Sequence, residues 1–393
     1  MIRSQLLRMP KVRGRAALIA ICCLLMSRTA FGQVVTAPTH YSIVNLSEIG
    51  SPLPYRTVSV ASLNKNGQVV GHYNYIDQKT SELISRAFLW KDDKIILLPP
   101  LPGFSNCIAA AQNDSGLIVG MVSNNLREVK VGRKTVVRGG DACACLWENG
   151  RPRRLVTPRP GSSEAAAVNA QGDIVGGYTV LSAKGYIKRA CLWKHGEFQD
   201  LGPVPVSLAK KGLLSWTAKK INDQGQVLGE VIGENETQAG PTALFWEKGH
   251  AKIAAASDRH LMMKVTNQNG DTLRGSSLFS HGSGIQLLWQ GQTAMGFDLN
   301  DAGQVVGAML TVKRNLTPAA QRSPYDSHAF LWEAGQMYDL NGLITSLSGI
   351  VLESAMNIDN HGRILVWASR RVADGPLLLV PEPKPNPPDA SIR

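Results

Sequence analysis

The sequence predicts an all-β fold, a seven-bladed β-propeller in which the N-terminal strand closes the last blade. Two short strings of residues recur in alternation along the chain, and the segment before the first full repeat has the pattern of a fourth strand. The composition agrees with this class, since 44% of the 393 residues are hydrophobic and only 18% are charged, with 38 Gly and 21 Pro. A disordered chain would instead carry high charge and few apolar residues.

The first repeated string is Asn-x-x-Gly with a second glycine four residues later. Its clear copies begin at Asn64, Asn113, Asn169, Asn222 and Asn300. Two copies are altered: the copy at Asn267 has an extra residue before Gly275, and the copy at Asp359 ends in Val366. Asn hydrogen-bonds its own backbone in turns, and Gly supplies the positive φ of a tight hairpin. Each copy therefore predicts a turn between the first two strands of a unit.

The second string is Ala-Phe-Leu-Trp or a variant of it. Its copies end at Trp90, Trp147, Trp193, Trp246, Trp289 and Trp332, so six of the eight tryptophans share one repeat position. In the seventh unit the string has become Pro376-Leu377-Leu378-Leu379. We expect it to form a third strand, with a glycine turn leading to a fourth. A large side chain at a fixed position predicts burial between neighbouring sheets, worth roughly 1.5–3 kcal/mol each.

Seven units of four antiparallel strands are the pattern of propeller blades. The last unit stops after its third strand, and residues 41–46 have the pattern of the missing fourth strand, so pairing the two would close a ring. A β-solenoid is the alternative fold. One unit fits poorly, because 11 residues separate Trp289 from Asn300 where other copies use 21 to 29. That blade could have three strands, or the count could be six and a half.

The N-terminus has the layout of a secretory signal peptide. Basic residues precede an apolar run over residues 16–26, and Ala30-Phe31-Gly32 offers a cleavage site before Gln33. As a helix, 11 residues rise about 16 Å against a membrane core of about 30 Å, so no transmembrane anchor is predicted. The expected divisions are a signal peptide (1–32), a propeller of seven repeats (33–380) and a Pro-rich disordered tail (381–393). The protein is expected to be secreted, either extracellular or periplasmic.

Removal of the signal peptide lowers the net charge. It carries six basic and no acidic residues, so 36 basic residues face 30 acidic ones and the net charge falls from +12 to +6. Nucleic-acid binding is therefore not predicted. Four cysteines remain: Cys107, Cys143, Cys145 and Cys191. Two of them lie in the Trp strings, where they are interpreted as small buried apolar residues.

The two alternating strings resemble the probable extracellular HAF repeat family. The family is named after a His-Ala-Phe string, which this chain retains as His328-Ala329-Phe330. The resemblance covers roughly residues 41–380. It implies export and repeated β structure, and it brings no catalytic residues with it.

Motifs of known chemistry are absent from the sequence. It contains no Gly-x-Ser-x-Gly, His-Glu-x-x-His, phosphate-binding loop or dinucleotide fingerprint. Turns such as Asn222-Asp223-Gln224-Gly225 offer one carboxylate at most, too few for calcium. No catalytic residue, metal ligand or cofactor is predicted.

Function is therefore expected on the surface, in the loops of varying length opposite the tight turns. The candidate binding residues are Arg127, Lys130, Arg133, Lys134, Arg138, Lys184, Tyr186, Lys188, Arg189, Trp216, Lys219 and Lys220. They suggest a monomeric binding propeller for an anionic extracellular ligand, such as an acidic polysaccharide or a protein. Solvated hairpins with incidental Lys and Arg are the plain alternative. A propeller enzyme acting on polysaccharide at the central channel mouth also stays open.

Overall fold

The chain forms a nearly all-β protein in a computed structural model. The described residues are 40–46, 56–124, 127–131, 134–138, 142–158, 161–183, 185–232, 242–255, 264–280, 283–289, 292–312, 325–345, 349–370 and 375–382. The expected signal peptide (1–32) lies outside them, as does the expected tail from residue 383 onward.

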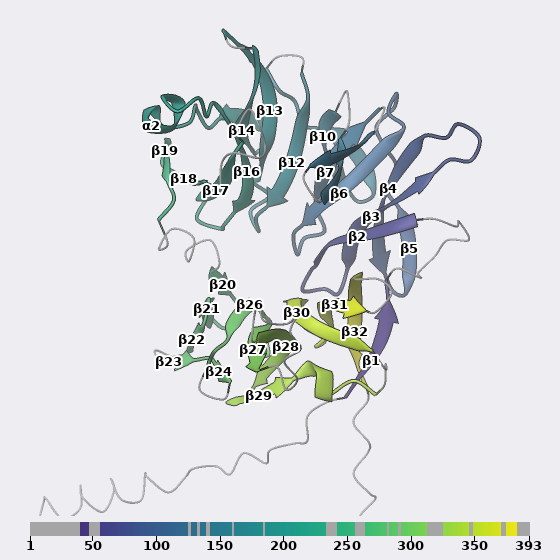
Figure 1. Ribbon diagram of the computed structural model, residues 1–393, viewed down its shortest axis with the longest axis vertical. Coiled ribbons are helices and arrows are strands. Elements are labelled where there is room, and N and C mark those ends of the chain that lie inside the picture. Colours follow the sequence, from purple (N-terminus) through teal and green to yellow (C-terminus); the bar gives the residue numbers. More distant parts are fainter. Residues whose placement is uncertain are drawn as a thin grey trace, which may run out of the picture. The chain divides into compact units, whose positions relative to one another are not determined.

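Seven four-stranded antiparallel sheets follow one another along the chain, here called blades 1 to 7 (Figure 1). Blade 1 contains β2 (Arg56–Leu63), β3 (Val69–Ile76), β4 (Leu83–Lys91) and β5 (Lys94–Leu97). Blade 2 contains β6 (Asn106–Gln112), β7 (Ile118–Ser123), β10 (Ala142–Glu148) and β11 (Arg151–Arg154). Blade 3 contains β12 (Ser163–Val168), β13 (Ile174–Ser182), β14 (Gly185–Lys194) and β15 (Glu197–Asp200).

The remaining blades have the same order of strands. Blade 4 contains β16 (Ser215–Ile221), β17 (Val227–Ile232), β18 (Ala243–Glu247) and β19 (His250–Ile253). Blade 5 contains β20 (Lys264–Thr266), β21 (Thr272–Arg274), β22 (Ser277–Ser280) and β23 (Ser283–Gln286). Blade 6 contains β26 (Met295–Leu299), β27 (Val305–Val312), β28 (Tyr325–Glu333) and β29 (Gln336–Asp339). Blade 7 contains β30 (Ile350–Ile358), β31 (Ile364–Arg370), β32 (Gly375–Pro381) and β1 (Tyr41–Asn45).

Blade 7 joins the two ends of the chain. Strand β1 pairs antiparallel with β32, with Tyr41 opposite Pro381 and Asn45 opposite Leu377. The Tyr41 amide also donates to the Leu343 carbonyl at 2.8 Å. The seven-bladed propeller and its closure by the N-terminal strand are thus confirmed.

Blade 5 differs from the sequence expectation. It has four strands, so neither a three-stranded blade nor a half blade is correct. Gly275, at φ +57°, turns the chain straight from β21 into β22, and both remaining strands are complete before Trp289. The Leu-Trp string here forms β24 (Leu288–Trp289), paired with β25 (Gln292–Thr293) outside the blade. Its expected place as the third strand is therefore wrong in this one copy.

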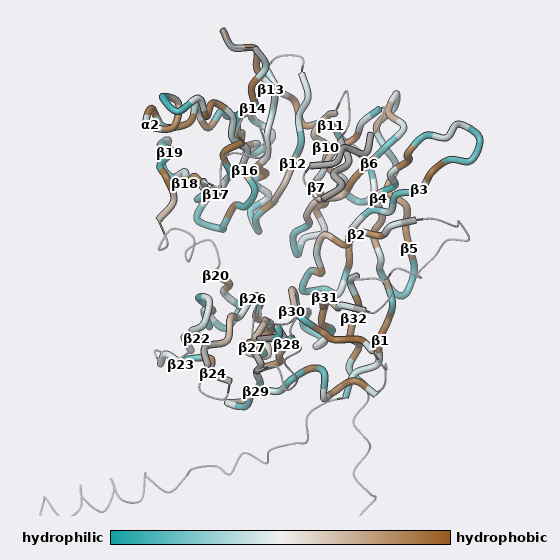
Figure 2. The backbone as a smooth tube through the Cα atoms, in the orientation of Figure 1, coloured by the Kyte–Doolittle hydropathy of each residue, from teal (hydrophilic) through white to brown (hydrophobic). Residues whose placement is uncertain are grey.

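The cores lie between blades. Six clusters of buried hydrophobic side chains each join two successive blades: 1 and 2, 2 and 3, 3 and 4, 5 and 6, 6 and 7, and 7 and 1. Figure 2 shows hydrophobic residues along many of the strands. The repeated tryptophans take part, since Trp147 and Trp193 are at most 2% exposed. Their indole nitrogens donate to Pro99 and Val156 carbonyls in the connections between blades, at 2.7 and 2.8 Å.

The first strand of each blade is the innermost. These strands contact one another from blade to blade: β2 with β6, β6 with β12, β12 with β16, β26 with β30, and β30 with β2. They therefore surround the central channel of the propeller. Along a four-stranded antiparallel blade, the turns after the first and third strands share one face, called the turn face. The connections after the second and fourth strands share the other, called the loop face.

The elements added to the four-stranded blades lie on the loop face. A hairpin of β8 (Arg127–Val131) and β9 (Lys134–Arg138) is inserted between β7 and β10. Helix α2 (Val206–Ala209) lies in the connection from blade 3 to blade 4, and the 3-10 turn η2 (Leu340–Gly342) follows β29. In the described part of the chain, no helix has the length and apolar character needed to span a bilayer.

Candidate functional site

The Asn-x-x-Gly turns are structural sites. In the copy at Asn113, the side-chain oxygen accepts from the Leu117 amide at 3.1 Å. Gly116 occupies the left-handed region at φ +84° and donates its amide to the Asn113 carbonyl at 3.1 Å. The asparagine thus closes its own hairpin, as expected from the sequence.

The same asparagines also join neighbouring blades, which sequence reasoning missed. In five copies the side-chain amide donates to the main-chain carbonyl of the equivalent residue in the next blade. The pairs are Asn64 to Asn113 (3.3 Å), Asn113 to Asn169 (3.0 Å), Asn169 to Asn222 (3.2 Å), Asn267 to Asn300 (3.1 Å) and Asn300 to Asp359 (3.0 Å). This asparagine belt uses both ends of the amide, so these side chains are already hydrogen-bonded within the fold.

The second glycine of the string is needed for a steric reason. In five blades the first strand bulges opposite it, which brings a first-strand carbonyl against the glycine Cα. A Cβ on Gly176 would lie 1.9 Å from the Glu164 carbonyl oxygen. Blade 7 has two bulges in β30, and there Val366 replaces the glycine opposite Ala355.

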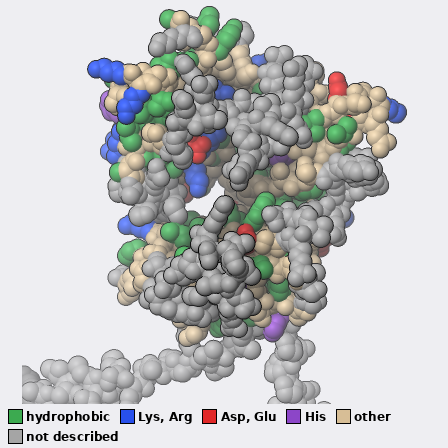
Figure 3. Space-filling model, viewed as in Figure 1, with side chains coloured by type: hydrophobic (Ala, Val, Ile, Leu, Met, Phe, Trp, Pro, Cys, Tyr) green, Lys and Arg blue, Asp and Glu red, His purple; other side chains and the backbone are tan. Residues whose placement is uncertain are grey.

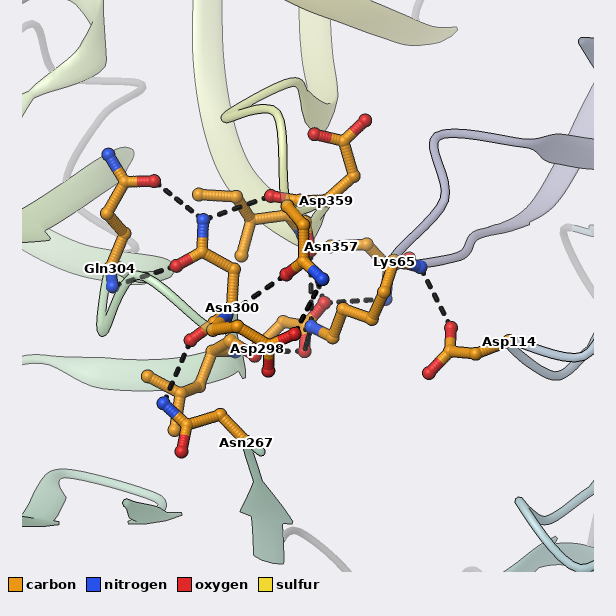
Figure 4. Close-up of polar contacts among 12 residues, drawn as sticks. Lys65, Asp114, Asn267, Asp298, Asn300, Gln304, Asn357 and Asp359 are labelled. Carbon is orange, nitrogen blue, oxygen red and sulfur yellow. Dashed lines mark hydrogen bonds and ion pairs between the residues drawn. The ribbon is translucent and has the colours of Figure 1, made fainter. Parts of the chain in front are cut away.

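A charged cluster closes the ring at the turn face (Figure 4). Lys65, in the blade 1 turn, reaches past blade 7 to blade 6. Its Nζ lies 2.8 Å from Asp298 Oδ1 and donates to the Leu299 and Ile358 carbonyls at 2.7 and 3.2 Å. The other Asp298 oxygen accepts from the Ile358 amide at 3.0 Å. Every polar group of the pair therefore has a structural partner.

The bulged positions of the inner strands offer little chemistry. The residues that the bulges leave without a register partner in the first strands are Ala61, Ala110, Ala166, Lys219, Phe297, Glu353 and Met356. They are mostly small or apolar. Among the residues that the structure describes, no three His, Cys, Asp or Glu side chains gather as a metal ion would require.

The candidate binding residues do not form one patch. Arg127, Lys130, Lys134 and Arg138 lie on the β8–β9 hairpin of the loop face. Arg133 and Lys184 fall outside the described residues.

Lys188 and Arg189, on β14, face partners in their own blade. Lys188 Nζ is 3.6 Å from Glu164 Oε1, and Arg189 lies 2.6 Å from Asp200. Tyr186, two residues earlier, is 79% exposed on the loop face.

Two expectations about blade 4 are corrected. Trp216 was expected to add aromatic surface, but it is fully buried and its indole nitrogen donates to the Gly202 carbonyl at 2.8 Å. It fills the core between blades 3 and 4, so it is unavailable to a ligand. Lys219 and Lys220 are exposed but lie on the inner strand β16, near the turn face, and not with the loop-face residues.

Exposed hydrophobic side chains gather on the loop face, a feature that sequence reasoning missed. Those at strand ends or connections on this face include Ile76, Val156, Leu181, Tyr186, Val206, Leu310 and Val351. The tight turns of the opposite face contain mostly polar residues, glycine and alanine, although Phe279 and Met356 are exposed at strand ends near that face. Knowing which strand end each apolar residue occupies required the actual register, so the strings alone could not reveal this asymmetry.

The histidine of the His-Ala-Phe string has a cross-strand partner. His328 Nδ1 lies 2.7 Å from Asp339 Oδ2 on the neighbouring strand β29. Arg189 and Asp200 occupy the same positions in blade 3. There, burial and the neighbouring Asp200 raise the pKa of Tyr178 to about 12. These are paired structural groups near the edge of each blade.

The four cysteines of the propeller are buried and present as free thiols. Burial raises the pKa of Cys145 to about 12, and that of Cys191 well above its usual value. Their interpretation as small buried residues is confirmed for both Trp strings that carry them.

No family model matches the sequence, and no curated protein matches it either. Three solved structures are similar to the chain at low identity. Porphyromonas gingivalis dipeptidyl peptidase 4 is 9% identical with a TM-score of 0.35, over 80% of this chain and 58% of that one. The β-propeller domain of the trilobed protease from Pyrococcus furiosus is 9% identical (TM-score 0.30; 84% and 99% covered). TolB from Acinetobacter baumannii is 13% identical (TM-score 0.26; 84% and 80% covered). The fold assignment rests on the seven sheets and the closing strand.

Proposed function

We propose that this chain is a secreted, non-catalytic binding propeller whose loop face holds an anionic extracellular partner. Export forms part of the proposal because residues 1–32 have the layout of a signal peptide. The resemblance to the HAF repeat family points the same way. Mass spectrometry of the protein purified from a bacterial host should find a mature N-terminus at Gln33.

The observation that carries the proposal is the difference between the two faces. The asparagine belt and the Lys65–Asp298 pair hold polar groups of the Asn-x-x-Gly turns in hydrogen bonds within the fold. The loop face instead combines exposed apolar side chains with the basic β8–β9 hairpin. Apolar surface rimmed by charge is typical of interaction sites on otherwise soluble proteins.

An enzyme site at the channel mouth has less support. Such a site needs two carboxylates, or a carboxylate and a histidine, placed about 6–9 Å apart around a substrate. Five of the seven bulged positions of the inner strands are Ala, Phe or Met, and most belt asparagines donate to the next asparagine's main-chain carbonyl. Binding is therefore the better account of the described surface.

Retention on immobilised heparin, a sulfated polysaccharide, tests the proposal. The loop-face variant replaces Arg127, Lys130, Lys134 and Arg138 by Ala. The matched control replaces Lys91, Lys94, Arg151 and Lys248, four exposed basic residues at or beside the turn face. Both variants lose four charges, so a difference between them reports position and not net charge.

The loop-face variant is expected to elute at clearly lower salt than the control, because counterion release depends on charges that meet the ligand. Equal elution of the two variants would show that retention follows net charge alone. That result would overturn the loop face as the anionic site.

A further inference from the structure

The tip of hairpin β13–β14 and helix α2 form a corner on the loop face, called here the hairpin–helix corner. Leu181 and Tyr186 are register partners at the tip, 67% and 79% exposed. Val206, the first residue of α2, is 71% exposed. An aliphatic–aromatic pair at the hairpin tip and a third apolar side chain in the connection after blade 3 are thus exposed to solvent.

Both elements of the corner are fixed at the same end of β16. The Lys188 amide, just below the hairpin tip, donates to Ser215 Oγ at 3.1 Å. On the helix, Leu208 is buried in the cluster that contains Trp216, the next residue along β16. The exposed side chains are therefore presented from a common support, as a preorganised docking surface requires.

Basic residues predominate in the sequence of the corner. Residues 178–189 and 202–211 contain no Asp or Glu, while they contain five Lys or Arg residues. Lys210 and Lys211 are exposed directly after α2. Figure 3 shows Lys and Arg side chains beside hydrophobic ones in the upper left of the view, where Figure 1 places α2. Two acids of blade 3, Glu164 and Asp200, lie against Lys188 and Arg189.

We propose that the hairpin–helix corner docks a protein partner through a segment with apolar side chains flanked by Asp or Glu. This inference rests on the proposed binding function and names the partner of that face. The charge complementarity requires an acidic partner. Leu181 and Val206 have no polar group with which to meet sugar hydroxyls, whereas aliphatic and tyrosine side chains inside a charged rim are the usual centre of a protein interface.

Panning the immobilised full chain against a phage library of random 16-residue peptides tests the inference. Selected peptides are expected to combine aromatic or aliphatic residues with Asp or Glu. The double variant Leu181→Ser and Tyr186→Ser should weaken their binding at least tenfold. The matched control is Phe279→Ser on blade 5, an aromatic residue 42% exposed away from the corner, which should bind as the wild type does.

Other outcomes separate this inference from the proposed function. Failure to select acidic apolar peptides, or binding that the double variant leaves unchanged, overturns the corner as a protein site. Heparin retention that falls in the double variant, with no peptide selected, overturns the protein partner in favour of a glycan and leaves loop-face binding intact. Since the three substituted side chains are exposed, a thermal unfolding midpoint within 2–4 °C of the wild type is expected as a check on folding.

Discussion

Lys65 Nζ and Asp298 Oδ1 lie 2.8 Å apart although 232 residues separate them in the chain. The contact ties blade 1 to blade 6 across blade 7, and the lysine donates to a main-chain carbonyl in each of blades 6 and 7 on the way. It fastens the part of the ring where the two chain ends meet.

Replacing Lys65 by Ala should destabilise the protein strongly. Asp298 is 9% exposed and would keep a buried carboxylate without its cation, which typically costs about 3–5 kcal/mol. Urea unfolding would measure the loss. Lys94→Ala, on the outermost strand of blade 1, is the control and should change little. Equal midpoints for the two variants would contradict a closing role for the ion pair.

Gly176→Ala should also be destabilising, by about 1–3 kcal/mol, because main-chain atoms leave no room for a methyl group. The new Cβ would meet the Glu164 carbonyl oxygen at 1.9 Å, and backbone cannot move aside as a side chain can. Gly342→Ala is the comparison, since no atom lies within 4 Å of its added Cβ. If both variants melt at the wild-type temperature, the steric explanation of the repeat glycine is wrong.

The asparagine belt is tested by Asn300→Asp. Asn300 is fully buried, and its amide donates to Gln304 Oε1 at 2.6 Å and to the Asp359 carbonyl at 3.0 Å. A carboxylate keeps the size but turns both donations into repulsion between oxygens, so a loss of about 2–4 kcal/mol is expected. Calorimetry would show it as a lower melting temperature. Asn149→Asp, in an exposed turn, should melt close to the wild type.

The His72 side chain predicts a sensitivity to acid. Burial lowers its pKa from 6.5 to about 4, against a main-chain bond with Ala109 that raises it. His72 is therefore protonated near pH 6.5 in the unfolded chain but only near pH 4 in the folded chain. This contribution to stability is fully present above pH 6.5 and is lost as the pH falls toward 4.

Between pH 7 and pH 4.5, the urea midpoint of the wild type should consequently fall more than that of His72→Gln. His40→Gln removes an exposed histidine and should follow the wild type. A parallel fall of all three proteins would exclude His72 as the source.

The buried thiols should resist alkylation. Because burial raises the pKa of Cys145 to about 12, its thiolate is scarce at pH 8 in the folded chain. Mass spectrometry after iodoacetamide treatment should find Cys107, Cys143, Cys145 and Cys191 unmodified in the native protein and modified in urea. Rapid native labelling of Cys145 would show that its surroundings open readily.

The repeat strings predicted the blades because each string has one local physical cause. Asn113 and Gly116 close a hairpin by bonds within five residues, so the turn could be read without knowledge of the rest. The string ending at Trp289 gave a wrong prediction for the same reason. Its residues match the repeat, but the chain turns at Gly275 and forms the third and fourth strands of blade 5 before it reaches Trp289. Trp216 lies outside the repeat string, and nothing local distinguishes a tryptophan in a core from one on a surface.

The site was less accessible from the sequence than the fold. Basic residues such as Arg127 and Lys130 could be assigned to a loop by counting strands. The partners of Lys188 and Arg189 could not, because Glu164 and Asp200 are brought to them by register across the sheet. Leu181 and Val206 stood out only once their strand ends and exposures were known.

Because β1 pairs with β32, the ring can close only late in the synthesis of the chain. Strand β1 is synthesised long before β32, and its pairing partners at residues 377–381 cannot be present until the rest of the propeller has been made. Until then the apolar surfaces that blades 1 and 7 bury against each other stay exposed. A chain truncated before Gly375 would lack β32 and could not close the ring.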